Sequence, residues 1–229
     1  MADMELVGDD LLLVAVREDG TLAVREKLRF GVAGAQLVTL AARGRVDIQK
    51  GRIIVMDASP TGDPLLDAAL GSMAERKRPP TAKAWVARNR PGLVESYLDR
   101  LATAGTITAR HHRVLGMFSA TRWDVTDPAR RDQARARLDA IATGAGDVDL
   151  AQAALAGLAD AIGLAALYYR GKERKRFKTA AQAHVDAAGT SDAVRRAAEA
   201  ANAAAISAAT LAAISATNSA ACSGGGPTC

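Results

Sequence analysis

The chain has 229 residues, a formal net charge of +5 and a pI near 9.5. Apolar residues make up 49% of it, enough to bury a substantial core, so we expect one domain over residues 1–219 and a disordered Gly/Ser tail over 220–229. Only 3% of the residues are aromatic, which disfavours a nucleic-acid surface built on base stacking.

The two ends of the sequence indicate a cytoplasmic location. Asp3, Glu5 and Asp9 stand where a secretory signal would carry basic and then apolar residues, so we expect no such signal. Cys222 and Cys229 both lie in the terminal "ACSGGGPTC" and form no paired ligand motif. A reducing compartment is the simplest interpretation.

The N-terminal part of the chain predicts a buried helix. The apolar run Leu11–Val16 fits either the first turns of a buried helix or a strand. We interpret Leu22–Phe30 as a charged loop, and the helix predicted after it spans Gly31–Arg43. This helix is apolar over most of its surface, which is typical of a helix inside a bundle.

A hairpin and a second helix follow. Val46 and Ile48 alternate with polar residues, and after a turn at 49–51 the residues Ile53 and Val55 are expected to pair back. In "SPTGDPLLD", Asp63 is a natural N-cap and the proline after it suits the first helical position. Asp67 lies one helical turn after Asp63. We expect the helix dipole to stabilise it there, and we do not expect the two carboxylates to form a catalytic pair.

The middle of the chain predicts two short helices and a second hairpin. Thr81 is expected to cap a helix in which Trp85 is a core anchor. A helix over 93–101 is expected to end at Gly105. After it, "TITARHHRVLGMFSATRWDV" predicts a strand and a two-stranded ribbon with its turn at Ser119 and Ala120.

Three more helices are predicted in the C-terminal half. Asp127 should cap the first, which carries four arginines that we interpret as a solvated face: Arg130, Arg131, Arg135 and Arg137. Leu150–Tyr169 predicts the central buried helix, in which Asp160 needs an arginine partner. The basic segment Arg170–Lys178 follows, and Ser191 should cap an alanine-rich helix that reaches about Ser219.

The sequence carries no recognisable catalytic or metal-binding pattern. His111, His112 and His184 have no ligand spacing to Cys, Asp or Glu, and no phosphate-binding glycine loop or nucleophile elbow is present. We therefore expect no enzyme activity, no cofactor and no metal.

Two segments carry a family resemblance. "LAARGRVDI", followed by a hairpin and "SPTGDPLLDAAL", resembles the Golgi phosphoprotein 3 family, including its bacterial members. Trp85, "LDRLATAGTIT" and Asp127-Pro128 add to the likeness. The resemblance implies a mainly α, single-domain helical bundle with two β-hairpins and a winged-helix-like segment. It also implies a peripheral membrane adaptor that binds anionic phospholipid head groups such as phosphatidylinositol 4-phosphate.

The resemblance also indicates where a head group would bind. The family's pocket uses a Trp and an Arg that fall on Val24 and Ala33 by ungapped register, and two arginines that fall near Pro91 and Val94. None of these four positions carries the family's residue type, but Arg25 and Arg90 are each one residue away. Together with Arg29, which also precedes the core helix, they are the predicted head-group residues: Arg25, Arg29 and Arg90. The predicted membrane contacts at the ribbon tip are Leu115, Met117 and Phe118.

Three alternatives stay open. "VESYLDRLATAG" followed by a ribbon is also the order of a nucleic-acid-binding winged helix. Glu95 and Asp99 make nucleic acid an improbable partner, because a surface that contacts phosphates needs cations. The chain would otherwise be a scaffold that acts through protein contacts only. The third alternative is that the apolar residues of the 113–123 hairpin pack against the bundle, or against a second subunit in a homo-oligomer, instead of contacting the membrane.

Overall fold

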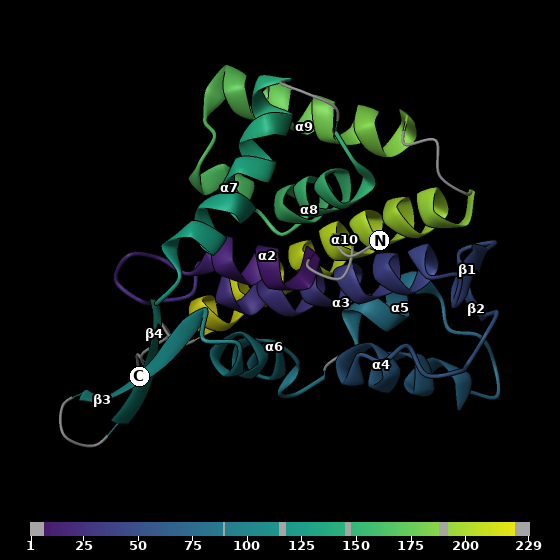
Figure 1. Cartoon of the computed structure of the whole chain (residues 1–229), viewed down its shortest axis with the longest axis horizontal. Coiled ribbons are helices and arrows are strands. Elements are labelled where there is room, and N and C mark those ends of the chain that lie inside the picture. Colours follow the sequence, from purple (N-terminus) through teal and green to yellow (C-terminus); the bar gives the residue numbers. More distant parts are fainter. Residues whose placement is uncertain (1–6, 89, 115–117, 145–147, 188–191, 223–229) are drawn as a thin grey trace, which may run out of the picture.

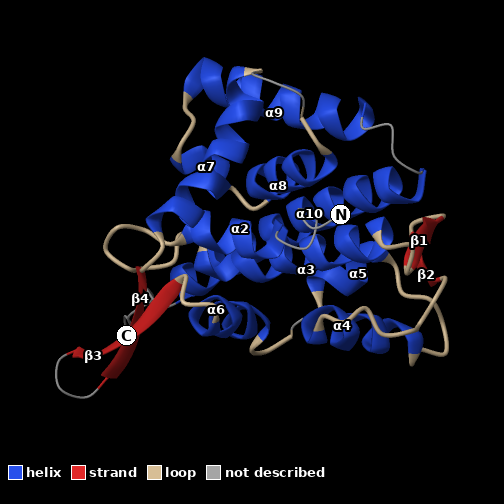
Figure 2. Ribbon diagram, viewed as in Figure 1, coloured by secondary structure: helices blue, strands red, loops and turns tan. Residues whose placement is uncertain are grey.

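A buried helix, α3, runs through the middle of this computed structural model, and most other elements are arranged around it (Figure 1). The structure describes residues 7–88, 90–114, 118–144, 148–187 and 192–222. The fold is mainly α with two antiparallel hairpins, as the sequence predicted (Figure 2). The elements are α2 (Val7–Ala15), α3 (Arg25–Ala42), β1 (Val46–Gln49), β2 (Arg52–Val55), α4 (Pro64–Ala74), α5 (Ala82–Ala87), α6 (Leu93–Thr103), β3 (Ile107–Val114), β4 (Phe118–Val125), α7 (Pro128–Thr143), α8 (Leu150–Ala161), a 3-10 turn (Ala165–Leu167), α9 (Gly171–Ala187) and α10 (Asp192–Cys222).

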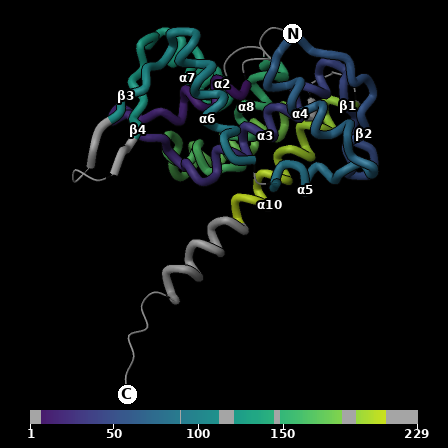
Figure 3. Tube along the Cα trace, turned by 90° about the horizontal axis from the view of Figure 1, so that it is seen from below, coloured from purple at the N-terminus to yellow at the C-terminus, as the bar shows by residue number. Residues whose placement is uncertain are grey.

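Small residues let other helices approach α3 closely. A Cβ on Gly31 would lie 2.5 Å from Leu11 of α2, and one on Gly34 would lie 2.5 Å from Leu158 of α8. The alanine-rich helix α10 packs along α3 and α5, and Figure 3 shows its described part passing beside them. The apolar run at Leu11 is therefore helical, and the prediction of an interior helix after it is confirmed.

The predicted start of that interior helix is wrong. The helix begins at Arg25, so most of the expected charged loop forms its first turns. The chain enters it through Val24, whose backbone is left-handed at φ 45°. Leu28 and Phe30 are buried, whereas Arg25 and Glu26 are exposed. These turns are therefore an amphipathic helix, although their charged residues had suggested a loop.

The predicted helix over Leu150–Tyr169 is also too long. α8 ends at Ala161, where Gly163 takes a left-handed φ of 82° and donates a backbone hydrogen bond to Asp160. Such a glycine commonly ends a helix. The buried environment is confirmed for most of α8, whereas Leu167 and Tyr168 beyond it are exposed. Asp160 does meet an arginine, since Arg174 Nε lies 3.9 Å from its Oδ1. Among the described helices, none combines the length and the apolar character needed to cross a membrane.

The two hairpins differ in how well their turns were predicted. In the first, Val46 pairs with Val55 and Ile48 with Ile53, as expected, around a left-handed turn at Lys50-Gly51. In the second, Ser119 and Ala120 lie inside β4, so the turn predicted there is wrong. The strand predicted before the ribbon is instead part of it, since "TITARHHRV" forms the first arm, β3. The connection to the second arm, β4, falls at 115–117, outside the described residues.

The arginines of α7 do not form the solvated face that we predicted. Asp10 of α2 is fully buried, and both Arg130 and Arg137 reach it, the latter at 2.9 Å from Nη1 to Oδ2. Arg135 lies over the ring of Tyr168, 3.7 Å from its centroid. A buried carboxylate needs cationic partners, so arginines of this helix turn toward the protein interior. The thin apolar face of the helix had predicted that they would lie in solvent.

Candidate anion-binding pocket

The three predicted cationic residues line one pocket. Arg25 and Arg29 come from the first two turns of α3, and Arg90 precedes α6. The pocket has a volume of about 210 Å³. Its other lining residues are Glu26, Pro91, Gly92, Val94 and Glu95. The structure therefore brings together residues that are far apart in the sequence.

Arg90 is held in place by neutral partners. Its Nη1 donates to Gln36 Oε1 and its Nη2 to the carbonyl oxygen of Trp85, both at 3.3 Å. Its guanidinium carbon lies 3.9 Å from the centroid of the Trp85 ring, and Trp85 is buried as predicted. Burial, and next the nearby charge of Arg88, lowers the pKa of Arg90 to about 10. The group is still charged at neutral pH.

Arg90 has no carboxylate partner in the described part of the chain. Its Nε is buried and donates no hydrogen bond to any described residue. Even a partly buried cation without a counter-ion loses some of its hydration, and an anion that entered the pocket would offset this cost. Arg90 is thus the residue of this pocket that an anion would neutralise.

The other two arginines form the outer part of the pocket. Arg25 is exposed, and Arg29 is partly buried with its guanidinium 4.7 Å from the centroid of the buried Phe30 ring. Residues four apart on a helix lie on one face, so both side chains belong to the same side of α3. Together the three arginines outnumber Glu26 and Glu95.

Two helices begin at this pocket without a side-chain cap. The N-cap of α3 is Val24 and that of α6 is Gly92, and neither has a side-chain oxygen that accepts a hydrogen bond from the first turn. The first N–H groups of a helix carry partial positive charge and bind anions readily. Glu26 and Glu95, each in a first turn, offset part of this charge.

The predicted apolar contacts lie mostly beyond what the structure describes. Leu115 and Met117 fall in 115–117, outside the described residues, and Phe118 begins β4 with its backbone paired to Val114. The hairpin projects from the helical body in Figure 1, and Trp123 and Ile107 are buried at its base. The membrane contact of these three residues stays a prediction.

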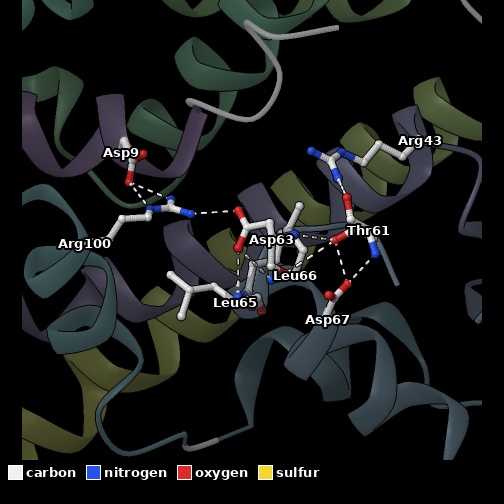
Figure 4. A network of polar contacts seen from close by, with 9 residues as sticks. Asp9, Arg43, Thr61, Asp63, Leu65, Leu66, Asp67 and Arg100 are labelled. Atoms are coloured by element: carbon white, nitrogen blue, oxygen red, sulfur yellow. Dashed lines mark hydrogen bonds and ion pairs between the residues drawn. The ribbon is translucent and has the colours of Figure 1, made fainter. Parts of the chain in front are cut away.

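The turn at "SPTGDPLLD" has a structural role (Figure 4). Asp63 Oδ1 accepts hydrogen bonds from the backbone of Leu65 and Leu66, which confirms the predicted cap. Asp67 Oδ1 accepts from both the backbone and the hydroxyl of Thr61, at 2.6 Å each. These hydrogen bonds lower the pKa of Asp67. Both carboxylates therefore hold the loop in shape.

Residues that could bind a metal do not cluster in the part of the chain that the structure describes. Across the described ranges, no group of three or more His, Cys, Asp or Glu side chains is arranged to hold an ion. Sequence reasoning found the three arginines but missed Gln36 and the two uncapped helix starts. Gly92 just before an apolar helical pattern was the signal for the second of these starts.

A comparison with known families now adds to this geometry. The family model described as Golgi phosphoprotein 3 (GPP34) matches residues 7–203. The chain belongs to the Golgi phosphoprotein 3 family. No curated protein matches it. The matched range includes every described residue of the pocket and both hairpins, and it ends within α10.

None of the four positions inferred from the family register carries the family's Trp or Arg. Of the four positions inferred by that register, Pro91 and Val94 line the pocket and Val24 is the N-cap of the adjoining helix. Ala33 is fully buried inside α3, so it contributes nothing to this surface. In this Golgi phosphoprotein 3 family member, Arg25, Arg29 and Arg90 supply the cations near those positions.

Proposed function

We propose that this member of the Golgi phosphoprotein 3 family is a peripheral membrane adaptor without enzyme activity. It binds anionic phospholipid head groups of the phosphatidylinositol 4-phosphate type in the pocket of Arg25, Arg29 and Arg90. Leu115, Met117 and Phe118 of the ribbon then enter the interfacial region of the bilayer from the cytoplasmic side. The single observation that carries the proposal is Arg90, a partly buried cation at neutral pH with no carboxylate partner among the described residues.

The size of the pocket supports binding of one phosphate group. Pockets that enclose whole drug-sized ligands have volumes of about 300–1,000 Å³. At about 210 Å³ this pocket is smaller, so it suits the charged end of a ligand whose remainder stays outside. A lipid head group meets this condition, because its acyl chains remain in the bilayer. Each arginine near an anionic surface contributes about 1 kcal/mol of attraction.

The nucleic-acid alternative is disfavoured by the surface of α6. Its Arg100 lies 2.6 Å from Asp9 and 2.8 Å from Asp63, so it is neutralised within the protein. The exposed residues of the helix include Glu95 and Asp99. A recognition helix that presents carboxylates repels the phosphate backbone. A scaffold that acts through protein contacts alone remains the second candidate, and it predicts no response to anionic vesicles.

Vesicle flotation tests the proposal directly. Wild-type protein should float with vesicles that contain phosphatidylinositol 4-phosphate, and less with vesicles that contain only phosphatidylserine at equal total charge. It should not float with neutral vesicles. Arg25→Gln should lower binding several-fold, because an exposed phosphate contact of about 1 kcal/mol is lost. Arg76→Gln, an equal charge change on an exposed residue outside the pocket, is the matched control.

Two results would contradict the lipid proposal. One is wild-type protein that ignores anionic vesicles at low salt, and the other is equal binding by Arg25→Gln and Arg76→Gln. Glu95→Gln tests the opposite change in charge. Removal of a carboxylate from the pocket lining should strengthen vesicle binding. A decrease would mean that the anion binds elsewhere.

The ribbon is tested separately. The combined substitutions Leu115→Ser and Phe118→Ser should weaken vesicle binding with little dependence on salt, because an apolar contact is not screened. A changed oligomeric state with unchanged vesicle binding would instead support the 113–123 hairpin as a contact between subunits.

A further inference from the structure

Two carboxylates line the same pocket as the three arginines. Glu26 comes from the first turn of α3, and Glu95 comes from the first turn of α6. Both side chains are exposed, and neither forms an ion pair or a hydrogen bond with any described residue. Because no described cation pairs with them, their charge acts on whatever occupies the pocket.

The charged side chains of the pocket lie at different depths. Arg90 is partly buried against the ring of Trp85, whereas Glu26 and Glu95 are exposed at the rim. A phosphate that reaches Arg90 therefore leaves the remainder of its head group beside the two carboxylates. That remainder meets negative charge.

The number of charges limits what the pocket can hold. Three arginines and two glutamates leave its lining with a formal net charge of +1. One phosphate monoester carries about −1.5 to −2 at pH 7, which already exceeds this charge. A second monoester would leave the occupied pocket with a net charge of about −2 to −3, so repulsion between like charges opposes its binding.

We propose that Glu26 and Glu95 restrict the pocket to head groups with a single phosphate monoester among uncharged hydroxyl groups. This inference rests on the proposed function and names the ligand class of the same site. The arginines bind the phosphate. Each carboxylate accepts a hydrogen bond from a hydroxyl group of the ligand but repels a further phosphate or carboxylate group. The selectivity thus comes from a repulsive element as well as an attractive one.

A first-turn glutamate also has a purely structural role. It stabilises its helix, because the N-terminus of a helix carries partial positive charge. This role would affect stability but not the choice of ligand. Glu173 allows the two roles to be separated, since it is an exposed glutamate in the first turn of α9 and lies outside the pocket.

Calorimetry with two soluble head groups tests the inference. The probes are glycerophosphoinositol 4-phosphate and glycerophosphoinositol 4,5-bisphosphate, which differ by one phosphate. Wild-type protein should bind the first at least as tightly as the second, although attraction to a basic surface alone would favour the second. Glu26→Gln with Glu95→Gln raises the net charge of the lining to +3. It should shift the ratio of the two dissociation constants about tenfold or more toward the bisphosphate.

The matched control is Glu75→Gln with Glu173→Gln, an equal charge change at exposed sites outside the pocket. It should leave the ratio unchanged, and thermal melts check that each variant is folded. If both probes bind and the ratio is the same in wild type and in the Glu26 and Glu95 variant, the inference is overturned while the proposed function stands. A shift only in the control variant would place the anion on another surface and overturn both.

Flotation with vesicles that contain the two corresponding lipids at equal mole fraction separates a lipid from a free sugar phosphate. A shift of the ratio with vesicles supports both proposals. A shift with the soluble probes alone supports the role of the carboxylates but contradicts the lipid proposal. If neither probe binds and the wild-type protein ignores both kinds of vesicle, the inference and the proposed function fail together.

Discussion

Arg100 and Asp63 join the start of α4 to the body of the protein. The Nη1 of Arg100 donates to Asp63 Oδ2 at 2.8 Å, while Asp63 Oδ1 caps α4 (Figure 4). The same guanidinium also donates to Asp9 of α2 at 2.6 Å. The side chains of Asp63 and Arg100 are only 18% and 28% exposed, so solvent screens this pair weakly. One arginine on α6 therefore ties three helices together.

We predict that Asp63→Ala lowers the free energy of unfolding by about 2–3 kcal/mol. A lost N-cap costs about 1 kcal/mol, and the loss of a charged hydrogen bond from a partly buried arginine adds about 1–2 kcal/mol. Asp63→Asn, which retains a capping oxygen, should lose only the second contribution. Urea unfolding of both variants checks this. Equal losses for Ala and Asn would show that the cap contributes little.

Two glycines should respond in opposite directions to the same substitution. Gly71 lies inside α4 with open space around its missing Cβ, so Gly71→Ala should stabilise the protein by about 0.5–1 kcal/mol. Gly163 has equally open space but a left-handed φ of 82°, so Gly163→Ala should destabilise it by about 1 kcal/mol. Thermal or urea melts measure both. A stabilising Gly163→Ala would mean that α8 extends past Ala161.

The pair of Asp47 and Arg196 should make stability depend on pH. Arg196 Nη2 donates to Asp47 Oδ1 at 2.8 Å, and this hydrogen bond is the main reason that the pKa of Asp47 is lowered from 3.8. A carboxyl group whose folded pKa is lowered stabilises the fold above its unfolded pKa. This contribution is lost as the pH falls through the folded pKa.

Asp47→Asn should therefore cost about 1 kcal/mol at neutral pH, and the difference from wild type should shrink below about pH 4. Arg196→Gln removes the same hydrogen bond and should show the same trend. Urea unfolding at neutral and acidic pH measures the difference. A difference that stays constant down to about pH 3 would show that the pair does not contribute through this titration.

Features that depend on adjacent residues were predictable from the sequence. The caps Asp63, Thr81 and Asp127 are confirmed, because an N-cap bonds to backbone groups two or three residues away. The first hairpin is confirmed for the same reason, since its turn and its alternating residues are contiguous.

Features that depend on distant partners were not predictable in this way. Arg130 was expected in solvent, but its partner Asp10 is 120 residues away in the sequence. The start of α3 depends on the left-handed backbone of Val24, a residue type that seldom adopts it. For the pocket, the three arginines were named from the sequence. The support of Arg90 by Gln36 and Trp85, however, requires the folded packing of α3 against α5.

Arg90 supplies the sharpest prediction for the pocket, because its ionisation can be followed by binding. Burial lowers the pKa of this guanidinium to about 10, below the ordinary 12.5, so the free pocket loses its central charge as the pH rises past about 10. A bound phosphate stabilises the charged form and raises that pKa, so by linkage the affinity must fall over the same range.

Inositol 1,4-bisphosphate is a suitable probe, because the second pKa of a phosphomonoester is about 6 and its charge is constant at higher pH. We predict that its affinity, measured by calorimetry at constant ionic strength, is level from about pH 8 to about pH 9 and falls above about pH 10. In Arg90→Lys the fall should begin at lower pH, because a lysine starts from a pKa of about 10.4 and the same burial lowers it. Identical pH profiles for wild type and Arg90→Lys would show that the bound phosphate does not contact this residue.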